Sequence, residues 1–303
     1  MSERLRLGAR GSALSVAQAT LVQRALGGEE RIDFVTVRTT GDRLSAEGAP
    51  IGWKGDFTKE LDDALLDGRV DLAVHSLKDV PSVLPPGLVL AVVPEREDPR
   101  DVLVSHPKRR LAELPHGARV GTSSPRRQAQ LRAARPDLEV LEARGNVDTR
   151  IRRMREGRFE AIVLARAGLA RLGRLEEIVE IFDEAVLLPA VTQGALGIVT
   201  RKDDARTDAV VRPLDHAPSH AEALAERGFL RMLQAGCRAP VAGRARAREG
   251  TLSLDGAVFS PDGAKILRGS RTGAVADAEA VGRALAEELL GRGAADLIAA
   301  SAD

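Results

Sequence analysis

Apolar runs, each followed by a polar turn and a helical stretch, recur along the first two thirds of the chain. LRLGAR leads into GSALSVAQATLVQRAL, and the same order recurs in ARVGTSS with PRRQAQLRAA, LEVLEARGN with VDTRIRRMREG, and EAIVLARAG with LARLG. Strands that alternate with helices are typical of parallel sheets, so this pattern predicts an α/β fold. The charged, proline-rich stretch from Ala91 to Ser105 predicts a linker between two α/β units.

The pattern changes at about Pro218. The stretch HAEALAERGFLRMLQ predicts a helix, and TLSLDGAVFSPDGAKILRGSRTG alternates apolar and polar residues around a Pro-Asp-Gly turn, which predicts antiparallel strands. DAEAVGRALAEELLGRG predicts a final amphipathic helix. We therefore expect the last third of the chain to form a small α+β domain.

Two adjacent arginines stand where a helix is predicted to begin. Ser124 and Pro125 form a helix-start signature, because serine caps the first N–H groups and proline costs nothing at the first helical position. Arg126 and Arg127 then fall in the first turn, where the helix dipole disfavours an exposed cation by ~0.3–1 kcal/mol. We therefore expect a negative group near them.

Several arginines share a position at or just after the end of a predicted strand: Arg10, Arg126, Arg127, Arg144 and Arg150. Ligands of α/β sheets bind outside the carboxyl ends of the strands, where helix N-termini also point. Because guanidinium groups match carboxylates bidentately, the set predicts a ligand with several carboxylates, or a phosphate. For any one arginine taken alone, a place on a solvated rim is the alternative.

A polar cluster ends the predicted buried strand in VDLAVHSLKDVP and comprises His75, Ser76, Lys78 and Asp79. Asp79 could cap the turn before Pro81, with Lys78 as its ion partner. Alternatively, a carboxylate held among cations stays ionised and stabilises positive charge that develops on a reacting ligand. The residues alone leave both interpretations open.

Composition narrows the classes of function. The formal net charge is +1, aromatic residues make up 2% of the chain and tyrosine is absent, so nucleic acid is a poor candidate partner. No apolar run is long enough to span a membrane and the N-terminus lacks an apolar export segment, so we expect a cytoplasmic protein.

Cys237 is the only cysteine, which excludes an internal disulfide and a cysteine-based metal cluster. It lies on a predicted turn beside Arg238, a setting that favours a reactive thiolate, although a small buried hydrophobe is the alternative. His216 and His220 have no accompanying set of acidic ligands, so we predict that they serve the entry and capping of a helix. No metal site is expected.

Seven motifs, in order over nearly the whole chain, closely resemble those of the porphobilinogen deaminase (hydroxymethylbilane synthase) family: VHSLKDVP, EREDPRD, GTSSPRRQ, RGNVDTR, AGLARLG, LPAVTQGALGI and GCRAPV. The resemblance implies two α/β domains like type 2 periplasmic binding proteins and a third, α+β domain with the cofactor-attachment cysteine. The implied boundaries are residues 1–95 with a return segment at 195–213, residues 100–192, and residues 217–303.

The resemblance also implies a transferase of heme and porphyrin biosynthesis. The family condenses four porphobilinogen molecules head to tail with loss of ammonia, then releases the linear tetrapyrrole hydroxymethylbilane by hydrolysis. Its dipyrromethane cofactor would be bound by a thioether to Cys237, and Asp79 matches the catalytic aspartate. The implied enzyme is a cytoplasmic monomer without a metal, nucleic-acid or membrane partner.

By resemblance, the cofactor carboxylates are bound by Lys78, Ser124, Arg126, Arg127, Arg144 and Arg150. The positions that match substrate-handling residues are Arg10, Ser12 and Arg171. Lys54 and Lys59 lie in the family's mobile loop region, where this chain has Gly52 and Trp53 in place of a glycine pair. We expect Trp53 to approach the bound pyrroles, and static packing is the alternative.

Two rival classes make different predictions. A periplasmic receptor would share the two-lobed α/β fold, but it would carry an export signal and would not need Cys237. A transferase of a phosphorylated ligand would explain arginines at helix starts, but it would carry a phosphate loop or metal-binding carboxylates, and neither pattern is found.

Overall fold

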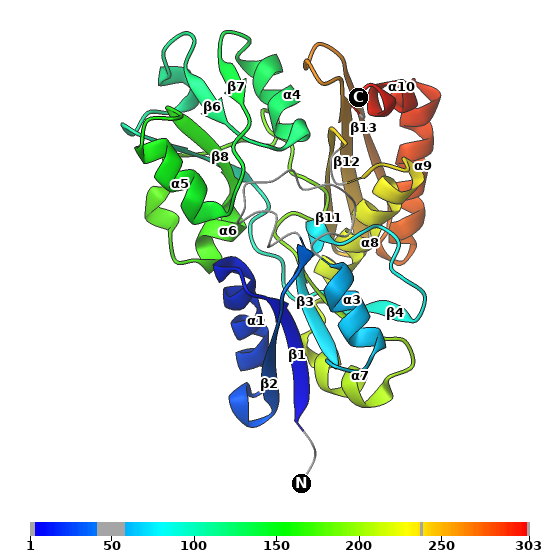
Figure 1. Ribbon diagram of the computed structural model, residues 1–303. Coiled ribbons are helices and arrows are strands. Elements are labelled where there is room, and N and C mark those ends of the chain that lie inside the picture. Colours follow the sequence, from blue (N-terminus) through cyan, green and yellow to red (C-terminus); the bar gives the residue numbers. More distant parts are fainter. Residues whose placement is uncertain (1–3, 41–57, 237–238, 302–303) are drawn as a thin grey trace. The chain divides into compact units, whose positions relative to one another are not determined.

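The computed structural model describes residues 4–40, 58–236 and 239–301 (Figure 1). Contacts between residues divide the chain into two compact units. Unit 1 comprises Met1–Glu97 and Ala195–His220, and unit 2 comprises Asp98–Gly194 and Ala221–Asp303. The first division falls between Glu97 and Asp98, within the charged stretch that the sequence marks as a linker.

Unit 1 is built on a five-stranded sheet with the order β2-β1-β3-β10-β4. β1 (Leu5–Arg10) pairs in parallel with β2 (Ile32–Val37) and with β3 (Leu72–Ser76). β10 (Leu196–Arg201) runs antiparallel to β3 and to β4 (Leu88–Val92). The chain therefore returns to its first sheet after building much of unit 2.

Helices cover both faces of this sheet, and their bounds are α1 (Ala13–Ala25), α3 (Lys59–Leu66) and α7 (Ala205–Val211), with 3-10 turns at Gly28–Glu30, Leu77–Asp79 and Arg212–Leu214. Successive side chains of a strand point to opposite faces. Accordingly, Leu72 and Val74 of β3 join the core cluster that contains α1 residues, whereas Ala73 joins the cluster that contains α3 residues. Burial on both faces explains the continuous apolar run in β3.

Unit 2 contains a second five-stranded sheet, ordered β7-β6-β8-β5-β9. Its strands and helices are β5 (Asp101–Ser105), β6 (Arg119–Gly121), β7 (Glu139–Leu141), β8 (Ala161–Ala165), β9 (Glu180–Ile181), α4 (Pro125–Ala134), α5 (Val147–Arg155) and α6 (Arg166–Arg171), with 3-10 turns at Leu111–Glu113 and Leu175–Glu177. β6 is parallel to β7 and β8, and β5 is antiparallel to β8 and β9. The two sheets therefore share one pattern of strand directions, although the antiparallel fourth strand is the last strand of its sheet in the chain for β10 and the first for β5. This arrangement confirms the predicted α/β class.

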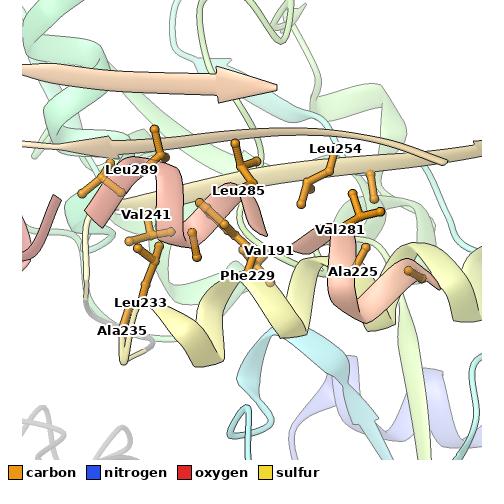
Figure 2. Close-up of a cluster of buried hydrophobic side chains, with 14 of the residues drawn as sticks. Val191, Ala225, Phe229, Leu233, Ala235, Val241, Leu254, Val281, Leu285 and Leu289 are labelled. Atoms are coloured by element: carbon orange, nitrogen blue, oxygen red, sulfur yellow. The ribbon is translucent and has the colours of Figure 1, made fainter. Parts of the chain in front are cut away.

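The last third of the chain forms an antiparallel sheet, ordered β11-β12-β13, and three helices. The bounds are α8 (Ala217–Met232), β11 (Val241–Arg248), β12 (Thr251–Phe259), β13 (Ile266–Ala274), α9 (Ala278–Gly291) and α10 (Ala294–Ala299), with a 3-10 turn at Val275–Asp277. Phe229 of α8, Leu285 of α9 and Leu254 of β12 belong to one buried cluster, which joins the helices to the sheet (Figure 2). The predicted hairpin is confirmed, and the helix predicted to be the last is α9, whereas β11 and the following helix α10 were not predicted.

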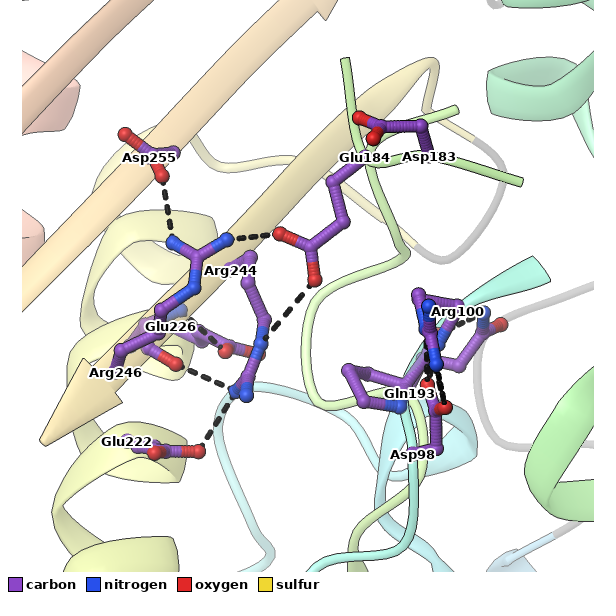
Figure 3. A network of polar contacts seen from close by, with 12 residues as sticks. Asp98, Arg100, Asp183, Glu184, Gln193, Glu222, Glu226, Arg244, Arg246 and Asp255 are labelled. Atoms are coloured by element: carbon purple, nitrogen blue, oxygen red, sulfur yellow. Dashed lines mark hydrogen bonds and ion pairs between the residues drawn. The ribbon is translucent and has the colours of Figure 1, made fainter. Parts of the chain in front are cut away.

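Polar contacts join this small sheet to the preceding part of unit 2 (Figure 3). Glu184 pairs with Arg244 and Arg246 of β11, and Arg244 also pairs with Glu222 of α8. The N–H of Gly243 donates to the carbonyl of Pro189 at 3.0 Å. The contacts of Glu184 and Pro189 lie between residues 98–194 and the C-terminal sheet, so the two segments pack as one unit.

Helices α8 and α9 approach each other closely because Gly282 has no side chain. A Cβ built at Gly282 would lie 1.9 Å from the carbonyl oxygen of Ala225. We expect Gly282→Ala to lower the free energy of unfolding by ~3 kcal/mol, because overpacking forces the two backbones apart. Urea unfolding followed by circular dichroism measures this loss.

Gly291 provides the matched control for this substitution. It lies in the same helix, and a Cβ there would meet nothing within 4 Å. Gly291→Ala should leave the urea midpoint unchanged or raise it slightly, because alanine favours helix over glycine by up to ~1 kcal/mol. Equal midpoints for Gly282→Ala and the unmodified protein would contradict the close approach.

Candidate active site

Four of the predicted site residues lie at one edge of the unit 1 sheet. Arg10 is the last residue of β1, and Lys78 and Asp79 lie in the turn directly after β3. Because β1 and β3 are parallel neighbours, their carboxyl ends share an edge. Ser12 begins α1 at the same edge, where its Oγ accepts a hydrogen bond from the N–H of Ser15 at 3.3 Å. The structure thus brings the predicted substrate and catalytic groups of unit 1 to one edge.

The turn that carries Asp79 is fixed by the buried side chain of Leu77. The N–H of Leu77 donates to the carbonyl of Ala195 at 3.0 Å, and a Cβ on Gly197 would come within 2.8 Å of the Leu77 side chain. Lys78 is half-buried and Asp79 is exposed. Among the described residues, Asp79 makes no side-chain hydrogen bond or ion pair. Its carboxylate is therefore presented from a rigid base.

His75 is a buried group beside this turn. It is 5% exposed, and its Nε2 has no hydrogen-bond partner within the described part of the chain. Burial, together with the positive charge of Arg10, lowers the pKa of His75 to about 4. The imidazole is therefore neutral near pH 7 and adds no charge to the edge that carries Arg10 and Asp79.

Three arginines that the sequence predicts for the site lie in unit 2, near strand ends or helix ends. Arg144 follows β7 and pairs with Glu142 at 2.8 Å, and Arg150 of α5 donates from Nε to the carbonyl of Gly145 at 2.7 Å. Arg171 ends α6 and donates to the carbonyl of Gly194 at 2.5 Å. The predicted cations Arg144, Arg150 and Arg171 are half-buried, so part of each side chain remains accessible.

Arg126 and Arg127 are buried, and their expected negative neighbour is Asp101 of β5. Asp101 is fully buried, and its Oδ1 accepts from Arg127 Nε at 3.0 Å and Nη2 at 2.7 Å, while Oδ2 lies 2.8 Å from Arg126 Nη2. Burial alone would raise the pKa of Asp101, but Arg126 and Arg127 outweigh burial and lower it to about 2. Ser124 caps the helix that carries both arginines, as predicted, and accepts from the N–H of Arg127 at 3.4 Å.

Gln193 completes this buried set. Its Nε2 donates to the carbonyl of Pro99 at 2.7 Å and to Asp101 Oδ1 at 2.8 Å, and its Oε1 lies 3.5 Å from Arg127 Nη2. Sequence reasoning missed Asp101 and Gln193 as individual residues, although both lie within the quoted motifs. The available signal was a lone carboxylate at the start of the apolar strand DVLVS, because a charge there needs a partner.

The groups of unit 2 fit a ligand that bears several carboxylates. Two buried guanidinium groups face one carboxylate, and the described residues offer no hydrogen-bond partner to the buried Ser123 Oγ and Arg126 Nε. Half-buried arginines add further donors for carboxylate oxygens. Within the described ranges, no group of three or more His, Cys, Asp or Glu side chains is arranged to hold a metal ion.

Other residues singled out from the sequence have simpler positions. Lys59 begins α3 and pairs with Asp63 at 3.0 Å, and His216 accepts from the N–H of Ser219 at the start of α8, as a capping role predicts. Cys237, Trp53 and Lys54 lie outside the described residues. No helix among the described residues has both the length and the apolar character of a membrane span.

Comparison with known proteins decides the family. The family model described as "Porphobilinogen deaminase, dipyromethane cofactor binding domain" matches residues 5–209, and "Porphobilinogen deaminase, C-terminal domain" matches residues 220–291. The chain belongs to the porphobilinogen deaminase family. This membership confirms the resemblance seen in the motifs and makes the chain an enzyme of tetrapyrrole biosynthesis with a dipyrromethane cofactor.

Full-length relatives support the same family. Porphobilinogen deaminase of Syntrophotalea carbinolica is 49% identical over 303 residues, which cover 99% of this chain and 96% of the relative. The enzyme of Rubrobacter xylanophilus is 50% identical over 300 residues, with 98% and 97% of the two chains covered. Among solved structures, a periplasmic binding protein from Brucella ovis is 16% identical with a TM-score of 0.39, covering 76% of this chain and 69% of its own.

Protonation of His75 should make unfolding pH-dependent. Because the pKa of His75 falls from 6.5 to about 4 on folding, the unfolded chain binds the proton more tightly between these values. The contribution of His75 to stability should therefore fall by up to about 3 kcal/mol as the pH drops from 6.5 to 4. Urea unfolding of the unmodified protein and of His75→Asn at several pH values measures this contribution as the difference between their two profiles, since His75→Asn should lack it.

Asp62 adds an opposing pH dependence that the comparison must cancel. Burial raises the pKa of Asp62 to about 6, so this carboxyl group stabilises the fold as the pH falls and opposes His75. The unmodified protein and His75→Asn both retain Asp62, so the difference between their profiles of stability against pH isolates the contribution of His75. Parallel profiles would show that His75 is not held neutral.

Proposed function

We propose that this chain condenses four porphobilinogen molecules head to tail, releases ammonia at each step and frees hydroxymethylbilane by hydrolysis. The observation that carries the proposal is the exposed carboxylate of Asp79, presented by a fixed turn beside Lys78 at the sheet edge where Arg10 ends β1. An acidic group among cations suits a substrate that bears two carboxylates and develops a positive charge.

Asp79 is the proposed catalytic residue. The C–N bond of the aminomethyl group breaks as ammonia leaves, and positive charge spreads over the substrate pyrrole. A fixed carboxylate lowers the energy of this transition state and needs no reorganisation when the charge appears. Leu77 anchors the turn, which keeps Asp79 in place during that step.

The cationic residues divide between cofactor and substrate in this proposal. Bound by a thioether to Cys237, the dipyrromethane supplies the pyrrole ring that accepts the first substrate. Its carboxylates are held by Lys78, Ser124, Arg126, Arg127, Arg144 and Arg150, and the substrate carboxylates are held by Arg10, Ser12 and Arg171. Support for the cofactor part of this division is that Arg126 and Arg127 share one carboxylate, Asp101, and that the buried Arg126 Nε has no hydrogen-bond partner among the described residues.

Partner and location belong to the same proposal. We propose that the enzyme acts as a monomer in the cytoplasm and does not bind nucleic acid. A single cysteine suits a reducing compartment, and the balanced charge with 2% aromatic residues offers little to a nucleic-acid strand.

Attachment of the cofactor to Cys237 is tested by intact-protein mass spectrometry. The mass of the active protein should exceed the sequence mass by two linked pyrrole units. Cys237→Ala should remove this excess, because no other cysteine is available to form the thioether. An active protein with the unmodified sequence mass would rule out the attachment.

The role of Asp79 is tested by Asp79→Asn, which keeps the shape of the side chain and removes its charge. This variant should fold and carry the cofactor mass, while kcat falls by about 10²-fold or more because the developing cation loses its counter-charge. Initial rates of porphobilinogen consumption and intact mass, measured on one preparation, separate the two effects. Near-normal turnover would show that Asp79 has only a structural role.

A further inference from the structure

A single buried carboxylate fixes the geometry of two neighbouring guanidinium groups in unit 2. Asp101 Oδ1 bonds to Arg127, and Oδ2 pairs with Arg126, so each oxygen serves a different arginine. Backbone carbonyls hold the opposite sides, because Val163 accepts from Arg127 Nη1 at 2.9 Å and Leu188 accepts from Arg126 Nη1 at 2.6 Å. Neither guanidinium can turn without breaking a buried charged contact.

The charges in this set do not balance. Arg126 and Arg127 contribute two positive charges, and Asp101 is the one carboxylate among the described residues that pairs with either of them. A charge buried without a partner is costly, and its field is weakly screened in the protein interior. The set therefore attracts a further carboxylate to its surroundings.

We infer that Asp101 is a positioning residue, which orients the Arg126–Arg127 pair toward the carboxylates of the cofactor and limits the buried surplus to one positive charge. Asp101 does not itself touch the ligand, since it is fully buried and both of its oxygens are occupied by arginines. Gln193 supports it through the hydrogen bond to Oδ1. This inference rests on the proposed function, in which the two arginines bind the cofactor.

Asp101→Asn tests this inference. The amide keeps the shape of the side chain but removes the negative charge and places N–H groups where one arginine needs an acceptor. When the purified protein without cofactor is incubated with porphobilinogen, the rate at which it gains the cofactor mass should fall about tenfold or more, the loss expected for one charge-assisted hydrogen bond.

Asp71→Asn is the matched control. Asp71 is also a buried aspartate between two arginines, with Arg6 at 2.9 Å and Arg201 at 3.1 Å, but it lies before the start of β3, at the end opposite Asp79. Both variants should lower the thermal unfolding midpoint. Only Asp101→Asn should slow the gain of cofactor mass, which is measured below both midpoints so that the protein is folded.

Gln193→Leu covers the case in which Asp101→Asn does not fold. This variant removes the amide contacts to Asp101 and Arg127 but keeps all three charges, so it should slow the gain of cofactor mass to a smaller extent. The inference would be overturned if folded Asp101→Asn gained the cofactor mass as fast as the unmodified protein. If Asp101→Asn cannot be obtained, the same result for folded Gln193→Leu would overturn it. An equal slowing in Asp71→Asn would also overturn it, because the effect would then be general destabilisation.

The same measurements separate this inference from the proposed function. If the unmodified protein and Asp71→Asn never gain the mass of two pyrrole units, the proposed attachment fails, and the inference that depends on it fails too. If both gain that mass and Asp101→Asn gains it equally fast, the proposed function stands and only the positioning role is lost.

Discussion

The buried contact between Asp101, Arg126 and Arg127 is the constraint on which unit 2 depends. Removing charged groups from water costs several kcal/mol per ion, and the cost is recovered only where each charge has well-placed partners. Asp101 meets this requirement with two guanidinium groups and the Gln193 amide. Because these groups come from the start of β5, the first turn of α4 and the segment before β10, the contact fixes three separate parts of the chain together.

The two five-stranded sheets apply one plan to different side chains. In each sheet, a parallel strand leads to a serine that caps the next helix: Ser12 after β1, and Ser124 after β6. In unit 1 the cation is Arg10, on the strand itself, whereas in unit 2 the cations lie inside the helix and reach inward to Asp101. The same arrangement of strands and helices therefore presents the exposed carboxylate of Asp79 at the sheet edge in unit 1 and buries the Arg126–Arg127 pair in unit 2.

The C-terminal sheet is held to residues 98–194 through both backbone and side-chain contacts. Glu226 of α8 is fully buried and accepts from the N–H groups of Thr192 and Ala245. Thr192 adopts a left-handed backbone conformation with φ of 58°, directly before Gln193. The buried carboxylate of Glu226 therefore fixes the turn at Thr192, and the next residue, Gln193, supports Asp101. Helix α8, which precedes Cys237 in the chain, and the contact of Asp101 with the two arginines thus depend on the same buried carboxylate.

The sequence by itself determined the local structure and the family. Alternating apolar and polar stretches predicted the strands and helices, the Ser124-Pro125 signature placed the start of α4 at the observed residue, and the ordered motifs identified the family. These features succeed because capping, turns and hydrophobic periodicity depend on residues close together in the chain. The polar residues at the strand ends were found for the same reason.

Only the tertiary structure decided which groups become partners. Arg127 lies 26 positions from Asp101 and 66 from Gln193, so no local pattern could predict that it would be buried against them. The return of β10 between β3 and β4, which the family resemblance implies but no local pattern shows, likewise depends on strand pairing across the folded unit. The physical reason is that the cost of burying a charge depends on every group that surrounds it, and those groups are brought together only when the sheet order is complete.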